Sequence, residues 1–175
     1  NVDLSYGGHR ENLGWFMAGN FFDEDGWRDH SKSSAKQFFG KLSLRNASVD
    51  ADLSLIHARS DLIGNSVAPE SMLRERWNQI FTFPDRTRND VTQLALSGRW
   101  WLSDSTNLSG AIYHRRSKTR TLNGDLNDEY ADNFPLVAET GADNRTRTRQ
   151  QGRGATLQWN LVSDRHSLAV GASHD

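Results

Sequence analysis

The sequence of 175 residues contains no cysteine and no long apolar run, and each absence excludes a class of structure. Without cysteine, disulfides, thiolate chemistry and cysteine-based metal sites are excluded. No stretch approaches the roughly 18 consecutive apolar residues of a transmembrane helix. The mean hydropathy is -0.74, which predicts that apolar residues are used sparingly, on one face of each element.

An excess of charge of one sign is also missing. The chain has 21 basic and 22 acidic residues, for a net charge of -1. A nucleic-acid-binding protein needs a basic surface, so nucleic acid is not an expected partner. The chain begins with neither an initiator methionine nor a basic-then-apolar signal segment. Because it opens directly on a strand-like pattern, we expect an N-terminal part of the protein to be missing.

Motifs of known chemistry are absent from the sequence as well. There is no GxSxG motif, no phosphate-binding loop, no HExxH motif and no pair of histidines at i, i+4 spacing. The acidic stretches 23–25 and 125–132 lack the register of a calcium-binding loop and are interpreted as solvated charge. The sequence therefore predicts no enzyme, no catalytic residue, no metal site and no cofactor.

Apolar and polar residues alternate in two adjacent runs. Leu94 to Leu102 and Leu108 to Ile112 each place their large apolar residues at every second position, and Ser103 to Thr106 supply turn residues between them. A period of two is typical of a strand. The segment is therefore predicted to form a hairpin with a very short connection.

The same pattern recurs along the chain and predicts eight strands in four hairpins. The other three hairpins are expected around residues 2–21, 40–55 and 155–172. Between hairpins, long connections are expected over Asp23 to Ser34, Asp61 to Asn89 and Thr121 to Gln151. The second of these could contain one or two helical turns between Pro69 and Trp77. Loops of such length usually carry function.

Three features favour a membrane barrel over a soluble β-sandwich or lipocalin-like barrel. The face opposite the leucines carries charges in mid-strand, which a dry core would reject: Asp3, Lys41, Asp52 and Arg99. The runs have about ten residues or more, whereas soluble strands average five or six. Short and long connections alternate, as in a barrel whose two rims face different compartments.

The predicted fold is therefore an all-β, antiparallel transmembrane β-barrel segment with short periplasmic turns and long extracellular loops. The apolar face would contact lipid, with four aromatic residues suited to an interfacial girdle: Tyr6, Trp15, Trp100 and Trp159. Two alternatives stay open. One is a complete small eight-stranded outer-membrane barrel with a structural or adhesion role, and the other is a soluble ligand-binding β-barrel.

Several phrases of the sequence also resemble the barrel region of TonB-dependent outer-membrane receptors. They are DGWRDHS (25–31), QFFGKLSLRN (37–46), ADLSLIHARSDLIGN (51–65), FTFPDRTRND (81–90), LALSGRWWLSD (94–104), RTLNGD (120–125) and NRTRTRQQG (144–152). The resemblance implies a barrel of about 22 strands with an N-terminal plug. It also implies uptake of siderophores, cobalamin or other scarce nutrients, with energy delivered through TonB.

On that resemblance, residues 1–175 would be an internal part of one barrel domain in the bacterial outer membrane, without the plug, the TonB-binding region or the remaining strands. The expected partners are outer-membrane lipid and lipopolysaccharide, TonB through the missing N-terminal region, and a small nutrient. A basic run at the end of one strand could meet acidic headgroups of the outer leaflet: Arg115, Arg116, Lys118 and Arg120.

Candidate ligand-binding residues lie in the first two long connections. The first offers Trp27, Arg28 and His30, and the second offers Arg74, Arg76, Trp77, Phe81, Phe83 and Arg86. Cations suit a chelate that carries carboxylate or catecholate groups, and aromatic rings add stacking area at modest entropic cost. We expect these loops to form part of an extracellular site for an anionic substrate.

Overall fold

The computed structural model, which describes residues 1–64, 67–133, 136 and 140–175, is a single antiparallel sheet of eight strands. The strands are β1 (Val2–Arg10), β2 (Leu13–Glu24), β3 (Ser33–Arg45), β4 (Val49–Ile63), β5 (Asp85–Ser103), β6 (Thr106–Leu126), β7 (Gly141–Val162) and β8 (Ser167–His174). Each strand pairs only with its neighbours in the chain. The prediction of eight antiparallel strands in four hairpins is confirmed.

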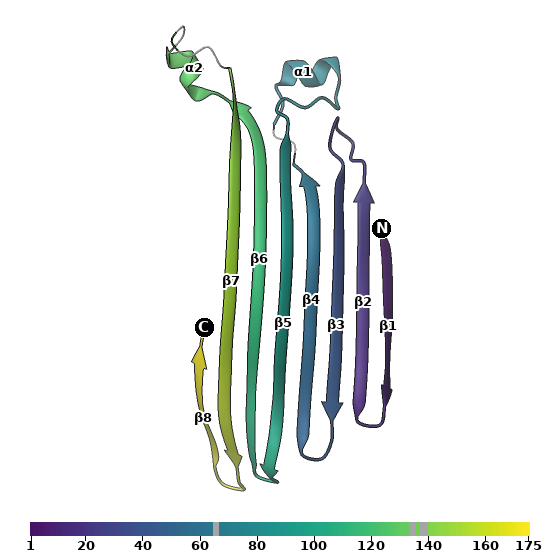
Figure 1. The fold of residues 1–175 in the computed structure, drawn as a ribbon, viewed down its shortest axis with the longest axis vertical. Helices are drawn as coiled ribbons and strands as arrows, with labels where there is room; N and C mark the ends of the chain where they lie inside the picture. Colours follow the sequence, from purple (N-terminus) through teal and green to yellow (C-terminus); the bar gives the residue numbers. More distant parts are fainter. Residues whose placement is uncertain (65–66, 134–135, 137–139) are drawn as a thin grey trace.

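The sheet is open. Its order runs from β1 to β8 without a pairing between these two edge strands, and the two ends of the chain lie at opposite edges (Figure 1). A closed eight-stranded barrel would join β1 to β8. The described strands therefore form a stretch of wall with two unpaired edges, which need further strands or another cover.

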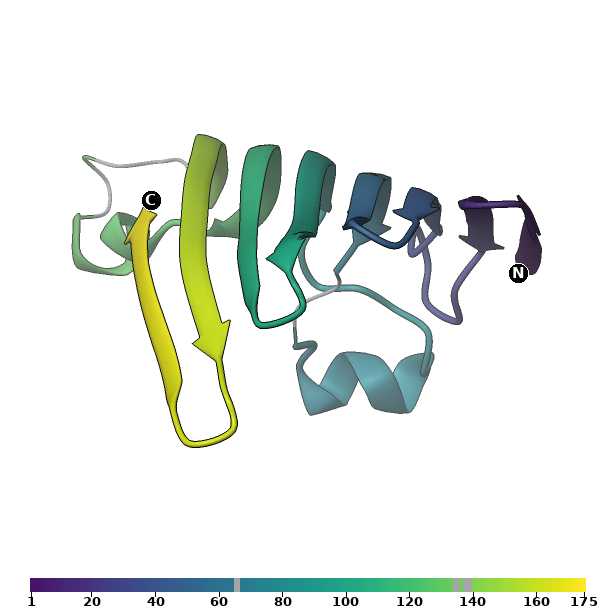
Figure 2. The same cartoon turned by 90° about the horizontal axis from the view of Figure 1, so that it is seen from below.

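Two short helices lie in the connections at one end of the sheet. Helix α1 (Glu70–Glu75) joins β4 to β5, within the segment where helical turns were expected, and α2 (Asp128–Asn133) between β6 and β7 was not predicted. Helix α1 lies off one face of the sheet rather than in its plane (Figure 2). Among the described residues, neither helix is long and apolar enough to cross a membrane.

Short turns occupy the opposite end of the sheet, here called the turn end, and the long connections define the loop end (Figure 1). In the turn between β3 and β4, the Asn46 side-chain oxygen accepts hydrogen bonds from the backbone N–H groups of Ser48 at 2.9 Å and Val49 at 2.8 Å. Asparagine favours turns because its side chain can replace a backbone partner in this way.

Strand register gathers the large apolar side chains on one face, here called the leucine face. Leu42 pairs with Leu53, Leu53 with Leu96, and Leu96 with Ile112, so one row of apolar residues crosses four strands. The four aromatic residues predicted for this face lie on it. No hydrophobic residue of the described part of the chain is buried, and Ile112 is 55% exposed. This face is a large apolar surface against which nothing in the described part of the chain packs.

The other face, here called the polar face, carries paired charges in mid-strand. Asp52 accepts hydrogen bonds from the Ser43 hydroxyl at 2.6 Å and from Arg45 at 2.8 Å, and it forms an ion pair with Lys41 at 3.3 Å. These partners lie beside one another on β3 and β4. The sheet therefore separates an apolar surface from a hydrogen-bonded polar one, as the alternation predicted.

The predicted boundaries of the second and third long connections were wrong, because three strands extend much further than expected, whereas the first connection lies within two residues of the predicted bounds at each end. Strands β5, β6 and β7 have 19, 21 and 22 residues, and they include much of what was assigned to the second and third long connections. The prediction followed apolar alternation, which stops partway along these strands. The backbone ladder continues beyond that point with charged and threonine residues, because hydrogen bonding between strands does not require apolar side chains.

Candidate functional site

The connection between β2 and β3 is a tight loop organised by Ser31. The Ser31 hydroxyl oxygen lies 3.1 Å from the backbone nitrogen of Arg28 and 2.6 Å from its carbonyl oxygen. Gly26 has a φ of +72°, and a Cβ there would lie 2.1 Å from the Ser31 hydroxyl. The loop therefore requires glycine at this position, both for its backbone conformation and for space.

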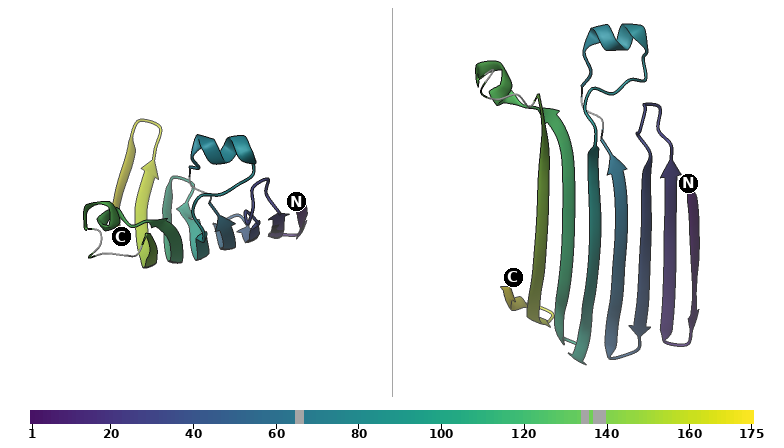
Figure 3. Two further views of the ribbon diagram at one scale, coloured as in Figure 1. Left: turned by 90° about the horizontal axis from the view of Figure 1, so that it is seen from above. Right: turned by 45° about the horizontal axis from the view of Figure 1, so that its top comes forward.

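Residues of the second long connection hold this loop in place. Asp29 donates its backbone N–H to the Asn78 carbonyl at 2.9 Å, and its carboxylate accepts from Arg76 at 2.5 and 3.2 Å. The Asn78 side chain adds a third hydrogen bond to that carboxylate at 3.0 Å. The two connections thus lie next to each other at the loop end (Figure 3), joined by a fork-shaped ion pair.

Aromatic rings from the two connections also meet. The indole rings of Trp27 and Trp77 stack with centroids 5.3 Å apart and planes 5° from parallel, and His30 lies 4.8 Å from the Phe83 ring. The Arg28 guanidinium lies over Trp27 at 4.6 Å. Trp27 and Trp77 remain 58% and 65% exposed. The structure therefore brings five of the predicted ligand-binding residues into two ring contacts between the connections, together called the aromatic cluster.

The predicted cations of the second connection are already engaged by carboxylates. Arg76 pairs with Asp29, and Arg74 pairs with Glu70 within α1 at 2.7 Å. Arg86 lies at the start of β5 and pairs with Asp61 of β4. The Arg86 hydrogen bonds lower the pKa of the Asp61 carboxyl below its ordinary value, opposed by partial burial. The loops consequently offer an anion less free charge than their arginine count suggests, while the aromatic surface is available.

A second charged region lies on the leucine face near the loop end. Register places Arg88 opposite Arg120 and Arg120 opposite Arg147, and it places Lys118 opposite Arg149. On this part of the face the cations are Lys36, Arg59, Arg86, Arg88, Arg116, Lys118, Arg120, Arg145, Arg147, Arg149 and Arg153, and the carboxylates are Asp23, Asp61, Asp90 and Asp143. A chain that is almost neutral overall therefore has a strongly basic patch.

Seven of these cations have no ion pair within the described part of the chain, because no carboxylate of the described residues lies within 4.0 Å of their side-chain nitrogens. Two of them are Lys36 and Arg153, and the other five lie next to one another on β6 and β7 and are here called the basic ladder: Arg116, Lys118, Arg120, Arg147 and Arg149. Repulsion from Arg120, followed by burial and by repulsion from the other three arginines of the ladder, lowers the pKa of Lys118 below its ordinary value. Like charges placed directly across a sheet destabilise it, so the ladder carries an electrostatic cost.

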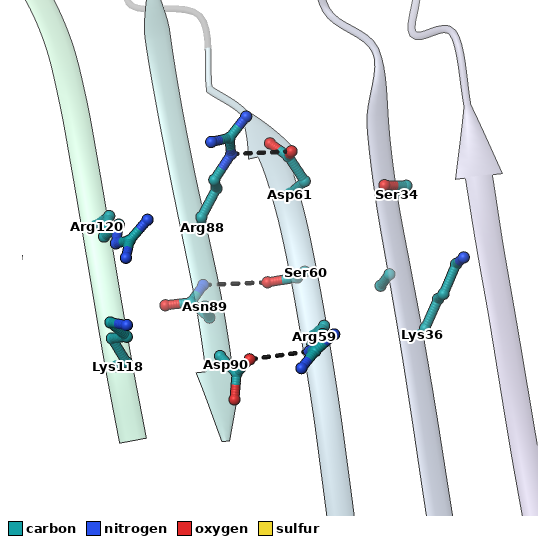
Figure 4. Close-up of a pocket in the computed structure, with 11 residues that line it drawn as sticks. Ser34, Lys36, Arg59, Ser60, Asp61, Arg88, Asn89, Asp90, Lys118 and Arg120 are labelled. Carbon is teal, nitrogen blue, oxygen red and sulfur yellow. Dashed lines mark hydrogen bonds and ion pairs between the residues drawn. The ribbon is translucent and has the colours of Figure 1, made fainter. Parts of the chain in front are cut away.

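The ladder borders an open hollow of about 460 Å³ that extends from β3 to β6. Figure 4 shows this hollow, with Lys118 and Arg120 on one side and Lys36 on the other. Between them, Arg59 pairs with Asp90 at 2.9 Å and Arg88 pairs with Asp61 at 3.1 Å. Asp61 on β4 and Asp90 on β5 thus form ion pairs with the arginines next to them, and neither carboxylate pairs with the basic ladder on β6 and β7.

Sequence reasoning found only part of this patch. It singled out the run from Arg115 to Arg120, but Arg115 belongs to the polar face, and three arginines of β7 were assigned to a loop: Arg145, Arg147 and Arg149. The missed signal is an alternation of arginine with threonine from Arg145 to Arg149 and from Lys118 to Thr121. It has the period of a strand although it contains no apolar residue.

No group of three or more His, Asp or Glu side chains that could hold a metal ion occurs among the described residues. The candidate features of this chain are therefore the aromatic cluster, the basic ladder and the exposed leucine face.

Comparison with solved structures shows what this sheet is similar to. The ferric preacinetobactin receptor BauA from Acinetobacter baumannii matches 98% of the chain with a TM-score of 0.68 and 10% sequence identity. The ferric-catecholate import receptor Fiu from E. coli K12 matches 98% of the chain in its open and closed forms, with TM-scores of 0.65 and identities of 13% and 12%. The fold is therefore that of a β-barrel segment of TonB-dependent receptors, as predicted.

The match covers only part of each receptor. The chain spans 27% of BauA and 31% and 28% of the two Fiu structures. No protein-family model matches the sequence, and no curated protein matches it. At these identities the likeness concerns the fold.

Proposed function

We propose that residues 1–175 form part of the barrel wall of a TonB-dependent outer-membrane receptor that takes up a scarce nutrient, such as a siderophore or another metal chelate. The observation that supports this proposal most strongly is the leucine face. It is exposed, has no core beneath it, and belongs to a sheet with the fold of a receptor barrel. The barrel continues beyond the two open edges, with the short turns in the periplasm and the long connections outside the cell.

Lipid supplies the cover that the leucine face needs. The apolar run on β2, from Leu13 to Phe21, matches the roughly nine to eleven residues with which a tilted strand crosses a membrane. Trp15, Trp100 and Trp159 lie near the turn end of this band, where an aromatic girdle is expected. Water on the polar face suits the paired charges around Asp52. The wall itself performs no covalent step.

The aromatic cluster at the loop end is the proposed contact for the nutrient. Catechol rings and aromatic side chains stack well, and BauA and Fiu are receptors for ferric chelates. Energy for uptake would come through TonB, acting on a plug outside this chain. In this arrangement the strands line the path of the nutrient, and the loops recognise the nutrient.

Cells that express the full-length protein test the proposal. We expect the protein in the outer-membrane fraction, with heat-modifiable migration on detergent gels, and uptake of radioactive iron from a ferric catecholate. Trp77→Ala combined with Arg76→Ala should lower uptake, whereas Arg165→Ala with His166→Ala in the β7–β8 turn should not. A protein that is monomeric and folded without detergent would contradict the membrane location, and unchanged uptake in the loop variant would remove the cluster from the site.

A further inference from the structure

The basic ladder lies on the same strands and the same face as the apolar band. On β6, Leu108 and Ile112 belong to the band, and Arg116, Lys118 and Arg120 follow at every second position towards the loop end. Strand β7 repeats the order, with Leu157 below Arg149 and Arg147. A molecule lying along this face would meet apolar side chains first and cations above them.

The ladder has the composition of a binding surface for phosphate. Arginine presents two parallel N–H donors to a phosphate group, and the stacking of cations from adjacent strands lets one phosphate contact two of them. Lys118 and Arg149 face each other directly, as do Arg120 and Arg147. Such pairs repel in the free protein and would be relieved by a polyanion between them.

The height of the ladder discriminates between lipids. Its cations occupy three successive levels, those of Arg116, Lys118 and Arg120, which span roughly 13 Å at about 3.3 Å per residue. An ordinary phospholipid carries its phosphate at one depth, next to the acyl chains. A glycolipid with phosphates on both its lipid-linked sugars and its outer sugars matches a surface with cations at several heights.

We propose that the basic ladder binds the phosphate groups of lipopolysaccharide in the outer leaflet, with the acyl chains of the same molecule against the apolar band below. The inference rests on the proposed function, because it requires the leucine face to be in the outer membrane. Binding of this ligand, which lies outside the sheet, would offset the electrostatic repulsion among the unpaired cations.

The test uses the full-length protein purified from outer membranes in mild detergent, stripped of lipid, and titrated with rough lipopolysaccharide. The ladder variant combines Arg120→Gln, Arg147→Gln and Arg149→Gln. We expect its affinity to fall on the order of a hundredfold at low salt, since each cation near an anionic lipid surface contributes. Dephosphorylated lipopolysaccharide should bind the unmodified protein as weakly as the intact lipid binds the variant.

The control variant removes the same charge elsewhere, by Arg10→Gln, Arg115→Gln and Arg165→Gln. Arg10 lies on the leucine face at the turn end, Arg115 on the polar face and Arg165 in a turn. The control should bind like the unmodified protein. Equal losses in both variants would show an effect of net charge alone and would overturn the proposal, as would undiminished binding by the ladder variant.

Two further measurements separate the outcomes. Inorganic phosphate is the soluble probe: binding as tight as that of lipopolysaccharide would mean a free-anion site and would overturn the lipid assignment. Iron uptake is measured on the same ladder variant. Normal uptake with unchanged lipopolysaccharide binding overturns this inference and leaves the proposed function standing, whereas absence of the protein from the outer membrane overturns both.

Discussion

The lower half of strand β6 and the stretch above it share one continuous pattern of backbone hydrogen bonds but present different side chains on the leucine face. The half near the turn end presents Leu108 and Ile112, and the half near the loop end presents Lys118 and Arg120. Pairing with β5 and β7 continues without interruption across the change. The difference teaches that strand register determines which face of the sheet a residue lies on. The surroundings at each height along the strand determine whether an apolar or a charged side chain is suited to that position.

Moving a charge into the apolar half should produce the largest effect. Leu96→Arg places a cation in the row between Leu53 and Ile112, where the proposed surroundings are lipid. We expect the free energy of unfolding in lipid vesicles to fall by about 2–4 kcal/mol, as measured by urea titration of the full-length protein. Ala95→Arg, one residue away on the polar face, should cost much less. The reverse order would mean that the two faces are assigned the wrong way round.

In the connections at the loop end, contacts between side chains stabilise the structure in place of contacts with lipid. Trp77→Ala removes the stack on Trp27 and should destabilise the association of the two connections by about 0.5–1.5 kcal/mol. The measurement is faster amide hydrogen exchange in residues 25–32, with unchanged exchange in β5. Phe81→Ala is the control, since Phe81 lies in the same connection and is also exposed. Identical exchange in both variants would show that the stack does not join the loops.

Removing a charge from the basic ladder should raise the stability of the protein, whereas adding a charge to the apolar band should lower it. Arg120→Gln relieves repulsion from Arg88 and Arg147 and should raise stability by about 0.2–1 kcal/mol in detergent free of lipopolysaccharide. Thermal unfolding followed by circular dichroism measures this. Arg59→Gln, which breaks the ion pair with Asp90, should not raise stability. If Arg120→Gln lowers it, Arg120 has a stabilising partner within the protein.

The smallest effect should come from Asp61, whose carboxylate forms an ion pair with Arg86 at the start of β5. The pKa of Asp61 is lowered by Arg86 in the folded protein, so its contribution is present above its ordinary pKa and is lost as the pH falls through the lowered value. Because Asp61 is partly exposed, we expect a contribution below about 1 kcal/mol. Unfolding of the protein and of Asp61→Asn, compared between pH 6 and pH 2, should differ at the upper pH and converge at the lower. A constant difference would contradict the assignment.

Much of the wall could be predicted from the sequence, because alternation of Leu94, Leu96 and Trp100 with polar residues fixes both the strand and its face. The upper ends of β5 to β7 could not be predicted from apolar alternation, since Arg147 and Thr148 carry the strand period without apolar residues. The contact of Trp27 with Trp77 was also beyond sequence reasoning. The two residues are far apart in the chain, and only the order of the strands brings their connections together.

A nitroxide scan of the leucine face along β6 tests the lipid boundary most directly. The chain has no cysteine, so single labels can be placed at positions 108, 112, 116 and 120 of the full-length protein, after replacement of any cysteine elsewhere, with position 111 as the polar-face control. In vesicles, labels at 108 and 112 should collide with oxygen, which dissolves in lipid, and labels at 116 and 120 with a water-soluble nickel chelate. Preferential collision with the nickel chelate at 112, or with oxygen at 111, would contradict a leucine face immersed in lipid.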